Sequence, residues 1–200
     1  MKKILSKDLN PKEHYNLLIS TITPRPIAWI STRGVDNSTN IAPFSFFTGI
    51  SSNPPIVAIS IGKKKNSRDK DTLKNIKEKK EFIIHMIDET FAKEINESAL
   101  AFDYGESEIE KLKLKYKNGS LVDVPMIDGV KVAYECKLHK IVEIGNVPMS
   151  VVFGEILCYH VIDDALHDNK ADEKKLKLLG RLGGKNFIKF DQDSMFEYKG

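Results

Sequence analysis

The sequence has few cysteines and no long apolar run, and both shortages restrict what the protein can be. Its 200 residues include two cysteines, Cys136 and Cys158, with no C-x-x-C arrangement. This count argues against a disulfide framework or a cysteine-based metal site and favours two buried free thiols. No stretch approaches the roughly 18 apolar residues of a membrane helix, and no apolar run of useful length follows Lys2 and Lys3. We therefore expect a cytoplasmic protein that makes no membrane contact.

An excess of charge of one sign is also missing. The chain has 31 basic and 28 acidic residues, a formal net charge of +3, so no global field favours nucleic acid. With 41% hydrophobic residues, 12 glycines and 8 prolines, the composition is that of an ordinary globular protein. The length predicts a single domain over residues 1–200 with a sizeable core.

Motifs for hydrolysis and for nucleoside triphosphate chemistry are absent. The chain has no H-E-x-x-H, no G-x-x-x-x-G-K-[ST] and no G-x-G-x-x-G after a strand. His85 lies within the apolar run FIIHMI, which favours a core histidine over a ligand or base. We predict no catalytic side chain.

Short apolar runs bounded by Pro, Gly and turn formers predict a mostly β fold: an antiparallel barrel with short helices. Residues 130–139 alternate with a period of two, which predicts one buried and one wet face. Residues 151–162 are apolar on both alternating sets and predict a strand buried on both faces. The other expected strands are 27–32, 40–47, 56–61, 81–87 and 187–190, with a hairpin loop at 33–39. One helix is expected to run to about Lys80 with Asp71 or Thr72 as its N-cap, and a second to about Ser98 with Asp88 as its cap. A short helical segment is expected within 170–179, and a surface helix or loop at 103–110.

One segment is strongly basic. Between Lys63 and Lys80 there are nine Lys or Arg residues and three Asp or Glu residues. A solvated basic face accounts for most of them. However, Ser67, Arg68, Lys70 and Thr72 stand beside backbone N–H groups at a predicted helix start, and this combination suits a phosphate monoester.

The segment NIAPFSFF, residues 40–47, combines small polar groups, a proline and three aromatics. One interpretation is that these aromatics belong to the hydrophobic core and bind no ligand. Next to a phosphate site, it suits FMN, because the flavin ring needs apolar walls at one edge and backbone hydrogen bonds at the other. A flavin carries its own redox chemistry, so the absence of an acid/base pair is no objection.

Taken in order, TPRPIAWIST, NIAPFSFF, SSNPPIVAISIG, SRDKDT, LVDVPMIDGVKVAYEC and LGRLGG resemble the flavin reductase-like, flavoredoxin-type family of FMN-binding split-barrel proteins. The resemblance rests on their order and spacing and covers nearly the whole chain. It implies an antiparallel, Greek-key-like split β-barrel and a homodimer with FMN near the interface.

The resemblance also implies roles for particular residues. Trp29 and Thr48 would line the pocket, although Trp29 could equally be core, and Ser60 would lie near the ribityl chain. Arg181 would lie near the nicotinamide or the partner subunit. The flavin-edge contacts, several through the backbone, would be Asn40, Ala42, Phe44 and Ser45, and the phosphate-end group would be Ser67, Arg68, Lys70, Asp71 and Thr72.

Three functions remain open from the sequence. The first is an NAD(P)H-dependent flavin reductase that uses NADH or NADPH. The second is a flavoredoxin-like electron carrier that keeps its FMN and meets redox proteins. The third, a binder of nucleic acid or an anionic surface through residues 63–80, is disfavoured because no aromatics are interleaved with the lysines.

Overall fold

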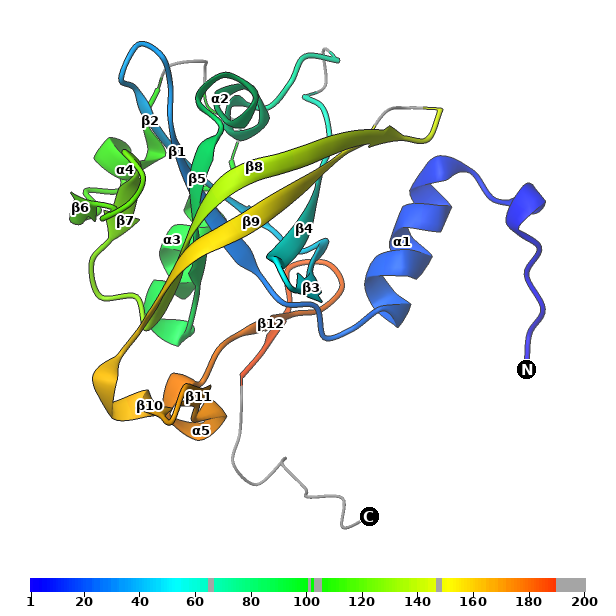
Figure 1. Ribbon diagram of the computed structural model, residues 1–200. Helices are drawn as coiled ribbons and strands as arrows, with labels where there is room; N and C mark the ends of the chain where they lie inside the picture. The colour runs from blue at the N-terminus through cyan, green and yellow to red at the C-terminus, as the bar shows by residue number, and fades with distance from the viewer. Residues whose placement is uncertain (65–66, 101, 103–105, 147–148, 190–200) are drawn as a thin grey trace.

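A seven-stranded antiparallel sheet forms the centre of the computed structural model, which describes residues 1–64, 67–100, 102, 106–146 and 149–189 (Figure 1). The strand order is β2-β1-β5-β8-β9-β4-β3. β-Branched residues are frequent in these strands because they pack well on a pleated surface. The strands are β1 (Ala28–Arg33), β2 (Thr39–Phe44), β3 (Phe47–Ser52), β4 (Pro55–Ile61), β5 (Glu81–Met86), β8 (Val132–Ile144) and β9 (Met149–Val161).

The connection between β2 and β3 shows how the sheet closes. These strands are at opposite ends of the sheet order, yet only Ser45 and Phe46 separate them in the chain. The backbone N–H of Ser60 on β4 donates to the carbonyl of Phe46 at 2.8 Å and so continues the β3–β4 ladder up to this short connection. The two sheet edges therefore lie close together without pairing as strands, which is the geometry of a split barrel.

The main core lies inside this barrel. Ile30, Ile59, Phe82 and Val152 are fully buried there, with Phe44 at its rim. A Cβ added at Gly154 would lie 2.3 Å from Cζ of Phe82, so β9 needs glycine where the Phe82 ring crosses it.

Short helices and small hairpins complete the fold. Asn10 caps α1 through a capping box with Glu13, and Pro11 occupies the first helical position, as its fixed φ angle favours. The helices are η1 (Ser6–Asp8), α1 (Pro11–Thr21), α2 (Asp71–Lys79), η2 (Glu89–Phe91), α3 (Ala92–Glu97), α4 (Glu108–Lys111), η3 (Asp163–Ala165) and α5 (Glu173–Leu176). The hairpins pair β6 (Tyr116–Asn118) with β7 (Pro125–Ile127), β10 (Leu166–His167) with β11 (Lys170–Ala171), and β12 (Gly180–Arg181) with β13 (Phe187–Ile188).

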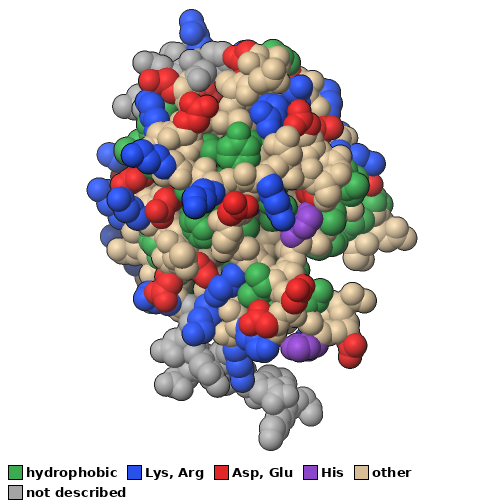
Figure 2. Space-filling model, turned by 90° about the vertical axis from the view of Figure 1, so that its left-hand side faces the viewer, with side chains coloured by type: hydrophobic (Ala, Val, Ile, Leu, Met, Phe, Trp, Pro, Cys, Tyr) green, Lys and Arg blue, Asp and Glu red, His purple; other side chains and the backbone are tan. Residues whose placement is uncertain are grey.

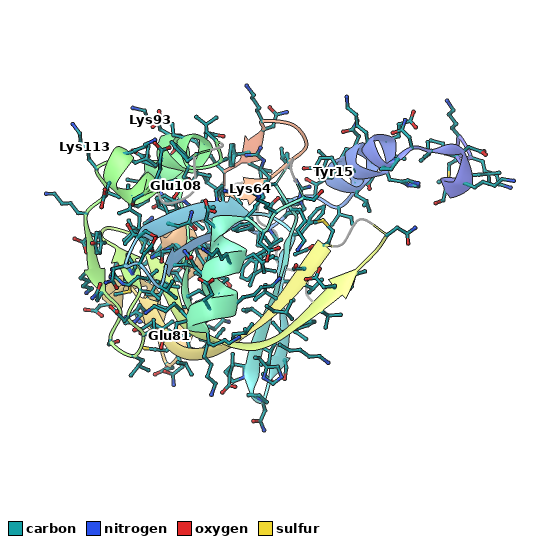
Figure 3. All side chains as sticks on the ribbon, turned by 90° about the horizontal axis from the view of Figure 1, so that it is seen from above. Tyr15, Lys64, Glu81, Lys93, Glu108 and Lys113 are labelled. Atoms are coloured by element: carbon teal, nitrogen blue, oxygen red, sulfur yellow. The ribbon has the colours of Figure 1, made fainter. Side chains whose placement is uncertain are left out.

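The N-terminal segment stands apart from the barrel. α1 buries none of its residues, and it extends away from the sheet in Figures 1 and 3, where Tyr15 is labelled. Leu17, Leu18 and Ile22 are exposed, and so are Ile4 and Leu5 before the helix. An apolar helix face without a partner in its own chain is a candidate for contact with another molecule.

The mostly β fold and most predicted elements are confirmed, but several local predictions were wrong. The N-cap of α2 is Lys70, one residue earlier than predicted. β9 buries one face only, since Leu157 and Tyr159 are exposed. On β8, Glu135 was assigned to the wet face, but its side chain is fully buried. Residues 103–105 and Phe190 lie outside the described residues, so the predictions there are not addressed.

No helix in the described part of the chain is both long and apolar enough to cross a membrane. On the face shown in Figure 2, Lys and Arg side chains are interspersed with Asp and Glu side chains.

Candidate functional site

Two aspartates form ion pairs with lysines in and after the basic loop before α2. Asp69 pairs with Lys63 and with Lys77, the latter at 2.9 Å, and Asp71 pairs with Lys64 at 2.8 Å. Burial favours the neutral form of Asp69, but hydrogen bonds from the two lysines outweigh this effect and lower its pKa. Three of the nine cations are therefore held in these ion pairs, and the 63–80 segment keeps an excess of positive charge.

Lys70 lies next to these ion pairs but takes no part in them. Its side chain is half-buried, no carboxylate pairs with it among the residues that the structure describes, and its Nζ lies 5.4 Å from the centre of the Phe44 ring. Burial lowers the pKa of Lys70, and the nearby charge of Lys64 lowers it further. An anion placed here would offset both effects.

The start of α2 adds backbone donors next to Lys70. The first N–H groups of a helix have no partner within the helix, and no side chain caps this N-terminus. Leu73 and Ile76 are fully buried in the main core and hold the helix in place. An uncapped helix start beside an unpaired ammonium group is a suitable site for a phosphate.

Of three residues predicted at the phosphate end, two are exposed on the loop and one is buried. Ser67 and Arg68 are exposed, and Ser67 has a left-handed φ of 63° that closes the loop through its N–H bond to Lys64 O. Thr72 is 1% exposed, and its hydroxyl donates to Oδ1 of Asn40 at 2.7 Å. The Thr72 side chain thus points into the protein, although its backbone belongs to the helix start.

The turn after β2 lies on a cavity. Phe44 and Ser45 line it together with Arg181, which is far away in sequence; the roles predicted for these residues remain predictions. Its other walls include Tyr15, Ile19, Arg25, Ile27, Leu182 and Phe187. Because Phe44 also faces Lys70, one aromatic ring connects the cavity with the start of α2.

Two arginines border this cavity. Arg25 is 5% exposed, and its guanidinium donates to the carbonyls of Ile19 (2.6 Å), Ile22 (2.8 Å) and Leu182 (3.0 Å). It therefore fixes the end of α1 against the barrel. The sequence analysis missed Arg25, although it is the only charged residue in the TPRPIAWIST segment.

The Arg181 guanidinium has fewer hydrogen-bond acceptors within the described part of the chain than that of Arg25, so more of its N–H groups can contact a ligand. Its guanidinium stacks over the Phe187 ring at 4.4 Å, and Nη2 donates to Gly184 O at 2.7 Å. Burial lowers the pKa of Arg181, and the charge of Arg25 lowers it further. A cation in this environment is a suitable partner for an anionic group of a ligand.

The remaining predicted residues lie at different depths. Trp29 is fully buried in a second core cluster and donates its indole N–H to Oγ of Ser98 at 2.9 Å, in accord with the core alternative. Thr48 is exposed on β3, Ser60 is half-buried on β4, and Ala42 faces Ile30 across the β1–β2 pair. The flavin roles of these residues remain predictions.

His85 is confirmed as a core residue. Its Nδ1 lies 2.9 Å from Trp29 O, and its Nε2 accepts the N–H of Ile127 at 3.0 Å. These bonds fix a neutral ring protonated on Nδ1, and burial lowers the pKa of His85 to about 4.

Asn40 has a different environment from the predicted flavin edge. Its amide nitrogen donates to both carboxylate oxygens of Glu108, at 2.9 and 3.1 Å, and its oxygen accepts from Thr72. The segment containing Glu108 was predicted to lie on the surface, but Glu108 is 5% exposed. In this arrangement the Asn40 side chain is engaged within the protein and its backbone pairs with Thr32 on β1, so the flavin-edge contact of Asn40 remains a prediction.

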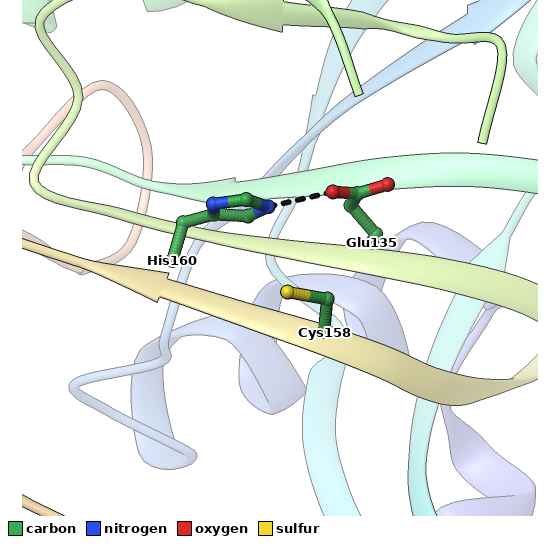
Figure 4. Close-up of side chains that lie close together, drawn as sticks. All are labelled: Glu135, Cys158 and His160. Atoms are coloured by element: carbon green, nitrogen blue, oxygen red, sulfur yellow. Dashed lines mark hydrogen bonds and ion pairs between the residues drawn. The ribbon is translucent and has the colours of Figure 1, made fainter. Parts of the chain in front are cut away.

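A second buried carboxylate, Glu135, lies near Cys158 and His160 (Figure 4), with ligand atoms within 4.8 Å of one another. Both Glu135 oxygens are occupied: they accept from the backbone of residues 120–122, from Oγ of Ser120 and from Nε2 of His160 at 2.6 Å. Burial favours the neutral form, but these hydrogen bonds outweigh it and lower the pKa of Glu135 to about 2. Glu135 therefore acts as a clamp: its hydrogen bonds hold the 119–124 loop against β8.

The fold and this site define the class of the protein. The chain is a mostly β split barrel, the fold of flavin-binding split-barrel proteins, and at the junction of β2 and β3 an aromatic cavity adjoins a cationic helix start. The chain belongs to the flavin reductase-like domain family, whose family model matches residues 20–175.

Comparison with individual proteins agrees with this assignment. An uncharacterised protein of Aquifex aeolicus is 38% identical and the match covers 88% of this chain and 89% of that protein. The crystal structure of nitrilotriacetate monooxygenase component B from Bacillus cereus is 31% identical, with a TM-score of 0.93 over 99% of this chain and 98% of that one. The 2-nitrobenzoate 2-nitroreductase NbaA from Pseudomonas fluorescens is 29% identical, with a TM-score of 0.84 over 99% and 96% of the two chains.

Proposed function

We propose that the protein binds FMN and transfers electrons from NADH or NADPH through it, as an NAD(P)H-dependent flavin oxidoreductase. Membership of the flavin reductase-like family supports flavin chemistry. The observation that carries the proposal is Lys70, a half-buried ammonium group that lacks a carboxylate partner among the described residues and lies between the uncapped start of α2 and the ring of Phe44.

The residues of the site fit the three parts of FMN. The phosphate dianion would lie at the start of α2, where Lys70 and the first-turn N–H groups are available. The ring would lie along the cavity formed by Phe44 and Ser45, whose apolar walls include Ile27 and Phe187. When bound, FMN supplies a ring that accepts hydride, while the protein binds and orients it.

The donor is proposed from the same cavity. Arg181 is a partly buried cation on the cavity wall, and a nicotinamide dinucleotide carries phosphates that such a group can bind. The second candidate function is a flavoredoxin-like electron carrier. It is favoured by Tyr15, whose ring lies on the cavity wall and 6.3 Å from the ring of Phe46, because aromatic cover over the flavin would exclude a nicotinamide.

We also propose that the protein is a homodimer. The exposed Leu17, Leu18 and Ile22 at α1 need an apolar partner, and the same helix contributes Tyr15 to the cavity. A second copy that covers α1 would complete the site from outside. Light scattering should give about twice the 22.6 kDa of one chain; a monomer that holds FMN tightly would contradict this proposal.

Anaerobic stopped-flow spectroscopy distinguishes the two functions. An enzyme of typical turnover should lose its flavin absorbance with NADH or NADPH at about 1–10³ per second. If millimolar concentrations of both nicotinamides fail while dithionite reduces the flavin, the protein is the electron carrier.

A further inference from the structure

A buried chain of polar side chains joins the two ends of the proposed FMN site. We infer that Glu108 is a positioning residue in this chain, because its carboxylate orients Asn40, which in turn holds the first turn of α2 through Thr72. We call Glu108, Asn40 and Thr72 the polar brace. The inference rests on the proposed function, since it assigns Glu108 a role in the binding of FMN.

The geometry of the brace fixes the orientation of Asn40. Both Glu108 oxygens accept from Nδ2 of Asn40, and Oε2 also accepts the backbone N–H of Ile41 at 3.1 Å. With Nδ2 bound to the carboxylate, Oδ1 must face the opposite way, where it accepts from the hydroxyl of Thr72 at 2.7 Å. All three members of the brace are buried.

A second link runs from Asn40 to the same helix. Thr32 on β1 donates to Oδ1 of Asn40 at 3.3 Å and accepts from Nδ2 of Asn75 on α2 at 3.0 Å. The brace therefore connects α4, β2 and α2. Asn40 precedes the Phe44 turn by four residues, and Thr72 follows Lys70 by two, so the brace sets the spacing between the ring end and the phosphate end.

Burial of the Glu108 carboxylate is unfavourable for folding, which argues against a purely structural role. Burial raises the pKa of Glu108 despite hydrogen bonds from its own backbone N–H, Ile41 and Asn40, and the charge of Asp71 raises it further. The carboxylate accepts hydrogen bonds from Asn40 and Ile41, which lie on β2, the strand that leads into the turn. Loss of the acceptor would release the Asn40 amide and loosen the first turn of α2 before it affected β2, because the ladder with β1 holds β2 independently.

A comparison of FMN affinity with riboflavin affinity distinguishes a positioning role of Glu108 from general destabilisation of the protein. Both need the ring end, but only FMN reaches the phosphate end. In Glu108→Gln, an amide N–H₂ replaces one acceptor and faces the Asn40 amide, so we expect FMN binding to weaken about tenfold, the effect of one charged hydrogen bond, with riboflavin binding changed by less than about twofold. Glu110→Gln, on the exposed side of the same helix, is the matched control and should leave both affinities unchanged.

A double-mutant cycle tests whether Glu108 acts through Thr72. Thr72→Val keeps the branched shape and removes the hydroxyl that donates to Asn40. If the brace acts as one unit, the double variant should bind FMN about as weakly as the weaker single variant. If the two losses multiply, Thr72 and Glu108 act independently and the inference is wrong.

Flavin fluorescence titrations give all these affinities. Unchanged FMN binding by folded Glu108→Gln, or equal weakening of FMN and riboflavin, would overturn the inference while leaving the proposed function intact. If Glu108→Gln does not fold, Thr72→Val alone decides: its FMN affinity must fall and its riboflavin affinity must not. A wild-type protein that binds neither flavin would overturn both the inference and the proposed function.

Discussion

Substitution of Lys70 by methionine should have opposite effects on the free protein and on its FMN complex. Methionine keeps an unbranched side chain against the Phe44 ring but removes the half-buried charge. In the free protein the ammonium group lacks a carboxylate partner among the described residues, so its loss should leave the free energy of unfolding unchanged or slightly higher. In the complex, a charge-assisted hydrogen bond worth about 1.5–3 kcal/mol is lost, and FMN should bind roughly tenfold to a hundredfold more weakly.

The pH dependence of this effect follows from the direction of the pKa shift. The pKa of Lys70 is lowered from 10.5 by burial and by Lys64, so the unfolded chain holds the proton more tightly than the folded one. The charge is therefore unfavourable for folding below the folded pKa, and this cost disappears as the pH rises toward 10.5. The stability advantage of Lys70→Met should be largest near neutral pH and should shrink in alkaline solution.

Calorimetric FMN titrations and urea unfolding measure the two effects. Lys79→Met is the matched control, since Lys79 lies at the other end of α2, about 12 Å along the helix axis, and should affect neither FMN nor riboflavin binding. Unchanged FMN affinity in Lys70→Met, or a clear loss of stability in its free form, would refute the assignment of Lys70 as an anion-binding group.

Three further predictions concern other parts of the molecule. Arg68→Ala should weaken FMN roughly tenfold to a hundredfold and leave riboflavin unaffected in the same titrations, and equal weakening of both would refute the phosphate assignment. Glu135→Gln should cost about 3 kcal/mol in urea unfolding at neutral pH. Because the pKa of Glu135 is lowered from 4.5 to about 2, this cost should shrink as the pH falls through that window, and a constant cost would contradict the clamp. Gly154→Ala should lower stability by about 1–3 kcal/mol through its clash with Phe82, whereas Gly49→Ala, with nothing near its Cβ, should not; equal thermal shifts would argue against this packing.

The sequence predicted the barrel well because its strands have strong local signals. The apolar runs around Ile30 and Ile59 are bounded by prolines and turn residues, and both became buried strands. The shared cavity of Phe44, Ser45 and Arg181 could not be predicted from local patterns, since nothing local connects positions so far apart in the sequence.

Two of the failed predictions concern charged side chains whose partners are distant in sequence. Glu108 and Glu135 have the local pattern of surface residues, yet Asn40 and the 120–122 backbone bury them by supplying hydrogen bonds. Likewise, the lysines of the 63–80 segment gave no indication of which of them Asp69 and Asp71 would neutralise. Such pairings depend on the folded geometry, so periodicity and composition could not reveal them.

The most direct test of the account is a crystal structure of the protein with FMN bound. The account predicts a phosphate oxygen within about 3.2 Å of Nζ of Lys70 and of first-turn N–H groups of α2, with the flavin ring against Phe44 and Ser45. A phosphate bound elsewhere, with Lys70 still directed at the Phe44 ring, would contradict it.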